Sequence, residues 1–303
     1  MIQVRGLTKR YRRSGTPAIE DVSFDVRNGE ILGFVGLNGA GKTTTIRVAS
    51  GVSLPTGGSV TVDGHDISGD KVAASMALGW VPEFPNFEPS AKALTQMRYY
   101  SGFYRIPSGE SRRRCLEALK MVGLEGHERE RLRTYSQGMK KRFSLAAALL
   151  PDPQNFVFDE ILNGLDPQGI QWLRDWMVEK RNDGHAIMLS SHILSEVQLI
   201  ADRIVFLHHG HVVRTMDRAD LTKDLRGSLR VTIENLDEGA LELLRPFGEL
   251  RREGPSTVVV VGRTSEAADI NFALTERKYR VAELRPDESN LEALFFETIG
   301  EAK

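Results

Sequence analysis

The chain has 303 residues, of which 41% are apolar and 27% charged, and its formal net charge is −1. This composition is typical of a folded globular protein of about two domains, and the near-neutral charge disfavours a protein that coats nucleic acid. The one cysteine, Cys115, excludes a disulfide framework and a cysteine-rich zinc site. Because no apolar run reaches the roughly 20 residues of a membrane span, we expect a cytoplasmic chain that acts at a membrane only through a partner.

Short apolar segments alternate with helical segments along the first 220 residues. Strand patterns at 2–4 and 22–26 precede a nearly continuous apolar run at 30–35, which is typical of a strand buried on both faces. A helix is expected to begin near Lys42, and further strand patterns follow at 77–81, 155–158, 186–189 and 204–207. Strands that alternate with helices predict a mainly parallel α/β sheet.

A domain boundary is expected near residues 215–228, where the charge changes sign. Residues 1–222 carry 28 Lys and Arg against 25 Asp and Glu, whereas residues 223–303 carry 12 against 16. In the second part the patterns predict strands at 229–234, 249–252, 257–261 and 279–284 and helices at 238–247, 266–278 and 290–299. The sequence therefore predicts one domain over residues 1–220 and a small α/β domain over residues 221–303.

A glycine-rich segment after the buried strand matches the pattern of a phosphate-binding loop in full. Glycines let backbone N–H groups approach phosphate oxygens closely, and the helix that follows presents its positive end to them. We expect Lys42 to reach the β- and γ-phosphates and the Thr43 hydroxyl to hold Mg²⁺. The residues expected to bind the nucleotide are Gly36, Leu37, Asn38, Gly39, Ala40, Gly41, Lys42, Thr43 and Thr44.

An apolar strand pattern that ends in two acids supplies the second half of such a site. In Phe156-Val157-Phe158-Asp159-Glu160 the acids stand at the C-terminal end of the strand. We expect Asp159 to lie beside Thr43 and bind Mg²⁺, and Glu160 to act as general base for the attacking water. Taken alone, the pattern fits equally well a strand that merely ends in acids.

A second candidate anion site precedes the acidic strand. Ser136, Gln137 and Gly138 stand at the start of an apolar helix, where Ser136 is a good N-cap. Helix starts bind anions because their first N–H groups lack partners within the helix. For this segment alone a plain capped helix is the alternative, but the chain then has two phosphate-binding helix starts about 100 residues apart.

These motifs in this order resemble the ATP-binding cassette of ABC transporters over about residues 1–220. Tyr11 resembles the family's adenine-stacking aromatic, and Ser136 to Gly138 resemble its signature sequence. Gly164-Leu165-Asp166 is similar to the D-loop, and Asp166 followed by Pro167 also suits the start of a helix. Ser190-Ser191-His192 after an apolar strand is similar to the switch histidine of the family.

The resemblance implies a fold and an assembly. The fold is a P-loop ABC ATPase core, with a mainly parallel sheet, an antiparallel β subdomain and a helical subdomain at about 84–150, followed here by the small C-terminal domain. Two subunits, identical or different, would close head to tail, so that the P-loop of one and the signature of the other enclose ATP and Mg²⁺. His192 would contact the γ-phosphate and Asp166 would couple the two sites.

The sequence departs from the commonest family pattern at three places. Glu83 stands where the family usually has a glutamine that touches Mg²⁺, the signature reads Tyr-Ser-Gln-Gly-Met, and Ile161-Leu162 follow Glu160. The first two departures resemble ATPase subunits of drug and antibiotic exporters, which are separate from their permease. Such subunits often carry a C-terminal α/β appendage with a Leu-Glu-x-x-Phe pattern, and residues 291–296 are similar to it.

We therefore expect an ATP-hydrolysing motor subunit of an exporter, bound through a transmembrane permease to the cytoplasmic face of the membrane, with no nucleic-acid partner. The aromatic-rich residues 84–110 are expected to form part of the permease docking surface, or else the core of the helical subdomain. One alternative is an ABC ATPase outside transport, although this chain lacks a second cassette and a coiled-coil insertion. An unrelated P-loop kinase would have neither the signature nor the switch histidine.

Overall fold

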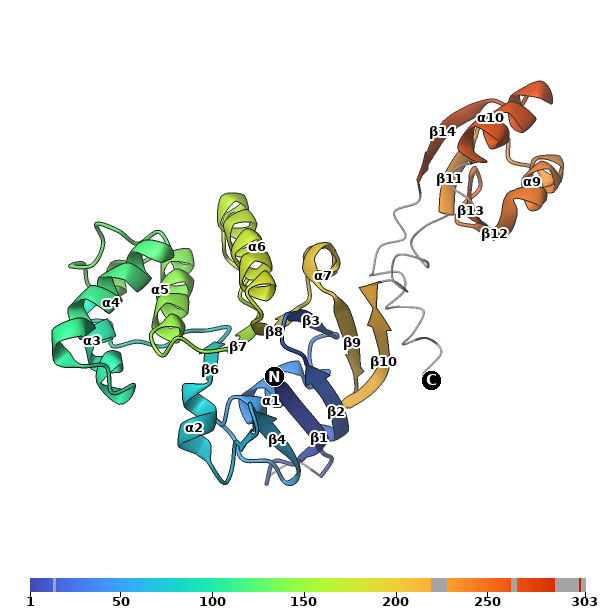
Figure 1. Ribbon diagram of the computed structural model, residues 1–303. Coiled ribbons are helices and arrows are strands. Elements are labelled where there is room, and N and C mark those ends of the chain that lie inside the picture. The colour runs from blue at the N-terminus through green and yellow to red at the C-terminus, as the bar shows by residue number, and fades with distance from the viewer. Residues whose placement is uncertain (13–14, 219–227, 263–265, 287–299, 301–303) are drawn as a thin grey trace. The chain divides into compact units, whose positions relative to one another are not determined.

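The computed structural model describes residues 1–12, 15–218, 228–262, 266–286 and 300 (Figure 1). The chain folds into two compact units, one spanning Met1–Thr215 and one that begins at Met216. None of the helices in the described ranges is long and apolar enough to cross a membrane.

An antiparallel sheet forms one layer of the first unit. Its strands are β1 (Ile2–Lys9), β2 (Ile19–Val26), β4 (Gly57–Val62) and β5 (His65–Asp66), in the order β2-β1-β4-β5. The predicted strands at 2–4 and 22–26 are parts of β1 and β2. The sequence analysis did not find β4 and β5, because β4 begins with two glycines and β5 has two residues.

A six-stranded sheet forms the second layer, in the order β10-β9-β3-β8-β7-β6. Its strands are β3 (Glu30–Val35), β6 (Leu78–Val81), β7 (Asn155–Asp159), β8 (Ala186–Ser191), β9 (Arg203–His208) and β10 (His211–Asp217). The pairs β3–β8, β3–β9, β6–β7 and β7–β8 are parallel, as predicted. All side chains of β3, β7 and β8 are buried, which explains their apolar runs.

Helices fill and cover these layers. The helix α1 (Lys42–Ala49) contacts β1 and β4 of one sheet and β7 of the other, so it lies between them. On the six-stranded sheet, α6 (Pro167–Asn182) and α7 (Leu194–Ile200) contact β3 and β8, and α2 (Lys71–Met76) contacts β6. This arrangement brings the carboxyl ends of β3, β7 and β8 to one edge of the sheet, next to the start of α1 (Figure 1).

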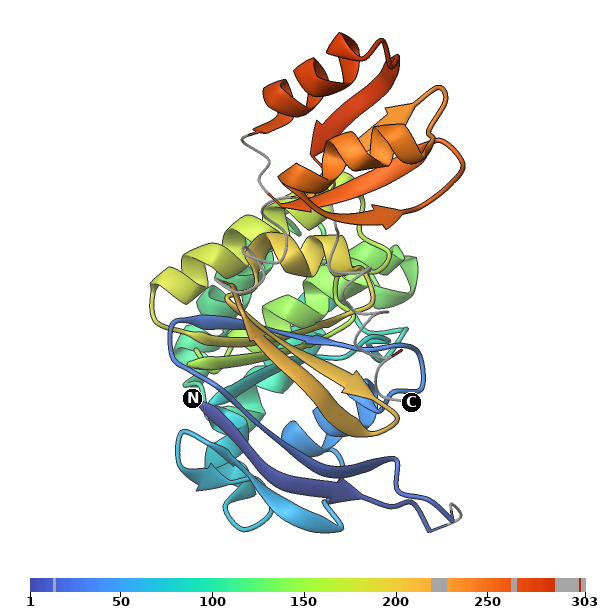
Figure 2. The same cartoon turned by 90° about the vertical axis from the view of Figure 1, so that its right-hand side faces the viewer.

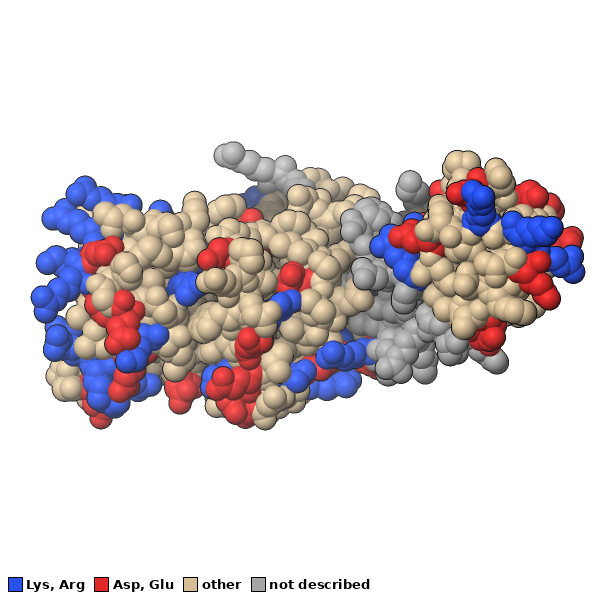
Figure 3. Space-filling view, turned by 90° about the horizontal axis from the view of Figure 1, so that it is seen from above, with Lys and Arg blue, Asp and Glu red and all other residues tan. Residues whose placement is uncertain are grey.

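A helical subdomain stands beside this core. It contains α3 (Ala93–Phe103), α4 (Ser108–Met121), a 3-10 turn at Leu132–Thr134 and α5 (Gln137–Leu149), which contacts β6. Cys115 is buried in α4, and burial raises the pKa of its thiol, which fits a structural role. Residues 84–150 carry 13 Lys and Arg against 6 Asp and Glu, and Figure 3 shows basic side chains gathered over this end.

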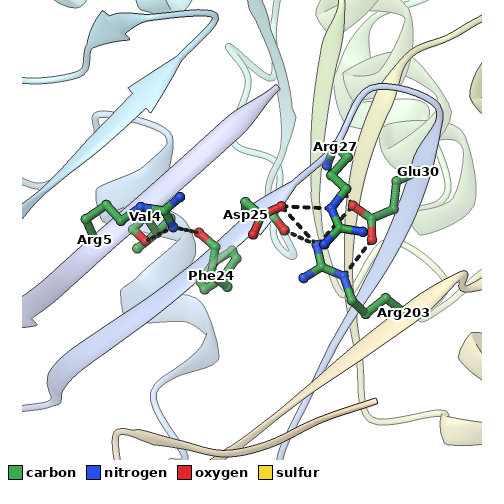
Figure 4. A network of polar contacts seen from close by, with 7 residues as sticks. All are labelled: Val4, Arg5, Phe24, Asp25, Arg27, Glu30 and Arg203. Carbon is green, nitrogen blue, oxygen red and sulfur yellow. Dashed lines mark hydrogen bonds and ion pairs between the residues drawn. The ribbon is translucent and has the colours of Figure 1, made fainter. Parts of the chain in front are cut away.

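A buried ion-pair network links the two sheets (Figure 4). Arg203 on β9 donates through Nε to Glu30 Oε1 at 2.7 Å and through a guanidinium nitrogen to the Asp25 carbonyl at 2.6 Å. Arg203 and Glu30 are 7% and 6% exposed, and hydrogen bonding to Glu30 is the main cause that raises the pKa of Arg203. The network ties β2 to β3 and β9, and so fixes the strand that leads into the P-loop.

The second unit is an antiparallel sheet with two helices. Along the chain it contains β11 (Ser228–Ile233), α9 (Glu238–Leu244), a 3-10 turn (Arg245–Phe247), β12 (Gly248–Arg252), β13 (Thr257–Gly262), α10 (Ala267–Glu276) and β14 (Val281–Pro286). The order β12-β13-β11-β14 with this βαββαβ sequence is the ferredoxin-like topology (Figure 2). The elements predicted in this part have the same type and order, while the helix predicted at 290–299 lies outside the described residues.

Candidate active site

The P-loop joins β3 to α1 in a conformation that only glycine allows at two positions. A Cβ on Gly36 would lie 2.4 Å from the carbonyl oxygen of Leu207. Gly41 has φ of +108°, and a Cβ there would lie 2.9 Å from the Ala18 carbonyl oxygen. Gly41 is also the N-cap of α1 and offers no side-chain acceptor, so the first N–H groups of α1 are left for another acceptor.

Lys42 is buried at the start of α1. Its Nζ donates to the Gly36 carbonyl oxygen at 2.6 Å and lies 3.6 Å from Glu160 Oε1. The side chain is 6% exposed, so its charge acts in a poorly solvated environment, where electrostatic interactions are strong.

The carboxylate at the end of β7 is also buried. Asp159 Oδ1 accepts a hydrogen bond from Ser190 Oγ at 2.9 Å, across the β7–β8 pair. Burial raises the pKa of Asp159, while hydrogen bonds from Ser190 and Thr43 act in the opposite direction. Thr43 and Asp159 therefore lie together, and their hard oxygen atoms are the ligand type that Mg²⁺ prefers.

Glu160 is held by side chains from several elements. Its Oε2 accepts hydrogen bonds from His192 Nδ1 at 2.9 Å and from Asn163 Nδ2 at 3.2 Å. Its backbone has φ of +50°, a left-handed conformation that is uncommon outside glycine. The carboxylate is nearly buried while His192 is half exposed, so the pair reaches from the protein interior to the surface of the cleft.

A cleft of about 570 Å³ brings many of the predicted residues together. From the sequence prediction it contains Leu37, Asn38, Gly39, Gly41, Lys42, Thr43, Thr44, Glu83, Glu160 and His192, and it is also lined by Thr16, Pro17, Ala18 and His209. Ala40 is buried beside the cleft, with its carbonyl oxygen accepting from the Gly210 N–H at 2.9 Å.

Tyr11 is not among the described residues that line the cleft. It follows β1, its side chain is 40% exposed, and the Lys9 ammonium lies 5.2 Å from the centre of its ring. The neighbouring segment Thr16–Ala18 lines the cleft in its place. The adenine-stacking role of Tyr11 stays a prediction.

The signature residues lie in a separate pocket of about 510 Å³. Ser136, Gln137, Gly138 and Asp166 all line it. The predicted caps are confirmed, since Ser136 Oγ accepts from the Met139 N–H at 3.2 Å and Asp166 Oδ1 from the Gly169 N–H at 3.0 Å. The pocket thus joins the signature to the D-loop, and within one chain it is distinct from the P-loop cleft.

The sequence analysis missed three side chains that shape the site. Ser190 orients Asp159, and Asn163 donates to Glu160. The third is Lys141, whose Nζ donates to the Glu160 carbonyl oxygen at 2.5 Å. Burial lowers the pKa of Lys141 to about 8, against the attraction of Glu83, Glu160 and Asp159. The sequence does not distinguish Lys141 from its basic neighbours Lys140 and Arg142, because its burial is seen only in the structure.

The structure accounts for one departure from the family pattern. Ile161 and Leu162 are each 1% exposed, so they pack in the interior directly after Glu160. Two apolar side chains at this point anchor the turn that carries the Glu160 carboxylate.

The arrangement suits in-line attack of water on a terminal phosphate. A buried cation (Lys42) and free helix N–H groups offset phosphate charge, and the Glu160–His192 pair can orient a water and accept its proton. These roles require no covalent intermediate on the protein.

Comparison with known proteins agrees with this chemistry. The profile of the family described as "ABC transporter" matches residues 19–163. The chain is 32% identical to an uncharacterized ABC transporter ATP-binding protein, YhcH of Bacillus subtilis (strain 168), over 100% of this chain and 97% of YhcH. It is 29% identical to the bacitracin transport ATP-binding protein BcrA of Enterococcus faecalis, over 99% of this chain and 96% of BcrA.

A solved structure extends the likeness to three dimensions. The dimeric post-hydrolysis ATP-binding cassette MJ0796, bound to ADP and Pi, is 25% identical and superimposes with a TM-score of 0.64, over 72% of this chain and 99% of that cassette. The likeness to YhcH spans both units of the present chain. The chain therefore belongs to the family of ABC transporter ATP-binding proteins, and it is an ATPase of that family.

Proposed function

We propose that this chain is the motor subunit of an exporter and that residues 1–220 form its ATP-binding domain, with residues 221–303 as an accessory domain. The observation that carries the proposal is the P-loop cleft, in which Lys42, Glu160 and His192 meet beside the buried Asp159. The likeness to the bacitracin transport protein BcrA over nearly the whole chain favours export. It also disfavours an ABC ATPase outside transport.

Within the cleft, different residues bind the phosphates, hold the metal ion and activate the attacking water. Lys42 and the backbone of residues 36–44 bind the phosphates. Thr43 and Asp159 would hold Mg²⁺, with Glu83 as a further oxygen donor at the edge of the cleft, and the ion would offset phosphate charge. Glu160 accepts the proton of the attacking water, while His192 fixes the Glu160 carboxylate through Nδ1 and faces the terminal phosphate.

Two subunits complete each site. The signature pocket of one subunit, with Ser136, Gln137 and Gly138, closes on the nucleotide in the P-loop cleft of the other, and Asp166 connects the two sites. Separate pockets for the P-loop and the signature within one chain support this assembly, as does the dimeric state of the MJ0796 cassette. The second subunit is either a copy of this chain or a related ATPase.

A transmembrane permease is the other partner and places the subunit at the cytoplasmic face of the membrane. We place part of its docking surface at residues 84–110. A groove of about 370 Å³ there is lined by Trp80, Phe87, Tyr100 and Tyr104, and the α3 side chains Tyr99 and Phe103 are more than 60% exposed. Apolar grooves and exposed rings of this kind suit a helix of a partner protein.

The substitution Glu160→Gln tests the proposal. It keeps the shape of the side chain but removes the base, so ATP binding is retained, turnover falls by at least about 100-fold, and an ATP-bound dimer accumulates. The measurements are steady-state ATPase activity, equilibrium ATP binding and the mass of the complex in ATP. The exposed Glu179 on α6 gives the matched control Glu179→Gln, which keeps full activity. Ordinary turnover by Glu160→Gln would remove Glu160 from its role.

A further inference from the structure

A buried lysine on α5, the helix that follows the signature, contacts the main chain of Glu160, the proposed catalytic base. Lys141 is in the second turn of α5, five residues after the Ser136 cap, and it is 5% exposed. Its Nζ donates to the main-chain carbonyl oxygen of Glu160 at 2.5 Å. Hydrogen bonds from a charged donor are stronger than neutral ones, so this contact is a firm link between α5 and the end of β7.

The link falls at a strained point of the backbone. Glu160 has φ of +50°, a conformation that persists in a residue with a side chain only where its surroundings hold it. Its N–H donates to the backbone and side-chain oxygens of Ser190, both at 3.2 Å, and its carbonyl oxygen accepts from Lys141. Both peptide groups that flank the Glu160 side chain are thereby fixed, one from β8 and one from α5.

We infer that Lys141 is a positioning residue, which fixes the backbone of Glu160. The inference rests on the proposed function, in which Glu160 accepts the proton of the attacking water.

The first test is Lys141→Met in the full-length chain, with Lys141→Arg as the conservative variant. Displacement of a catalytic group by about 1 Å costs roughly 100-fold in rate. We therefore expect Lys141→Met to lower kcat by about 10- to 100-fold, with the ATP dissociation constant within about twofold of the unsubstituted chain. Lys141→Arg keeps a donor and restores most of kcat. Lys120→Met on α4, where Lys120 is exposed and paired with Glu125, is the matched control.

Unchanged kcat in Lys141→Met, or an equal loss in Lys141→Arg, would overturn the positioning role. Glu160→Gln in the same assay separates these outcomes, because its ordinary turnover would instead overturn the proposed function.

Discussion

The two units of this chain differ in what they bury. In the described residues of the first unit the buried side chains include charged groups, among them Lys42, Lys141, Asp159, Glu160 and Arg203. In the described residues of the second unit every buried side chain is apolar, with Leu229, Val231 and Ile233 of β11 packed against α9 and α10. Both units bury an apolar core, but among the described residues only the first unit also buries charged side chains.

Burial of a charged side chain costs free energy of folding, so a buried charge is expected where it serves binding or catalysis. Charges in a dry site act strongly on a phosphate and need no reorganisation as the reaction proceeds. The hydrolysis proposed above uses buried charged side chains of the first unit, whereas the described residues of the second unit bury no charged side chain. The difference predicts that similar substitutions have different consequences in the two units.

The largest effect is expected from Glu30→Ala. It leaves the Arg203 guanidinium buried without its main partner, which costs roughly 3 to 5 kcal/mol in the free energy of unfolding. Urea unfolding of the first unit measures this loss. In the second unit Glu234→Ala removes an exposed ion pair with Arg280 and costs less than about 1 kcal/mol. Similar losses at the two sites would contradict the difference between the units.

Lys42→Ala is the next largest change, and it acts on activity. It removes a buried positive charge from the P-loop cleft, so kcat/KM for ATP falls by roughly 100- to 1,000-fold. Steady-state ATPase assays at several ATP concentrations measure it. Arg252→Ala, an exposed position on β12, serves as the control in the second unit and keeps kcat/KM unchanged.

A smaller effect is expected from Ile270→Val in the core of the second unit. Ile270 is fully buried on α10, and removal of one methylene group costs about 0.5 to 1.5 kcal/mol. Hydrogen exchange of the β11 and β13 amides reports this loss. ATPase activity stays unchanged, and a drop in kcat would mean that the second unit contributes to the site.

Deletion of residues 223–303 is expected to have the smallest effect on nucleotide binding. All described residues that line the P-loop cleft lie in the first unit, so the ATP dissociation constant stays within about twofold. Titration of the truncated chain with ATP provides the measurement, and thermal unfolding confirms that it is folded. Loss of ATP binding in a folded truncated chain would contradict the independence of the first unit.

The local patterns predicted most of the elements well. The strand at 30–35 appears at the predicted bounds, and the caps at Ser136 and Asp166 follow from side chains that bond a backbone group three residues away. The pattern failed at β4 and β5, where two glycines and a two-residue strand leave little apolar alternation. It also missed β10, an edge strand in which only Met216 is buried. The strand β4 forms because β1 offers it a partner, and β5 forms because β4 offers one in turn, which is information from outside each segment.

The sequence by itself determined which family the chain resembles and which residues to propose for its chemistry. A P-loop needs its glycines and lysine in a fixed order, and an acidic pair at the end of an apolar strand is a contiguous feature, so Lys42, Thr43, Asp159 and Glu160 could be predicted directly as site residues. Only the tertiary structure decided which side chains hold these groups in place. Lys141, Ser190 and Asn163 reach the site through helix packing, strand pairing and a turn, and contacts of this kind leave no periodic signal in the chain.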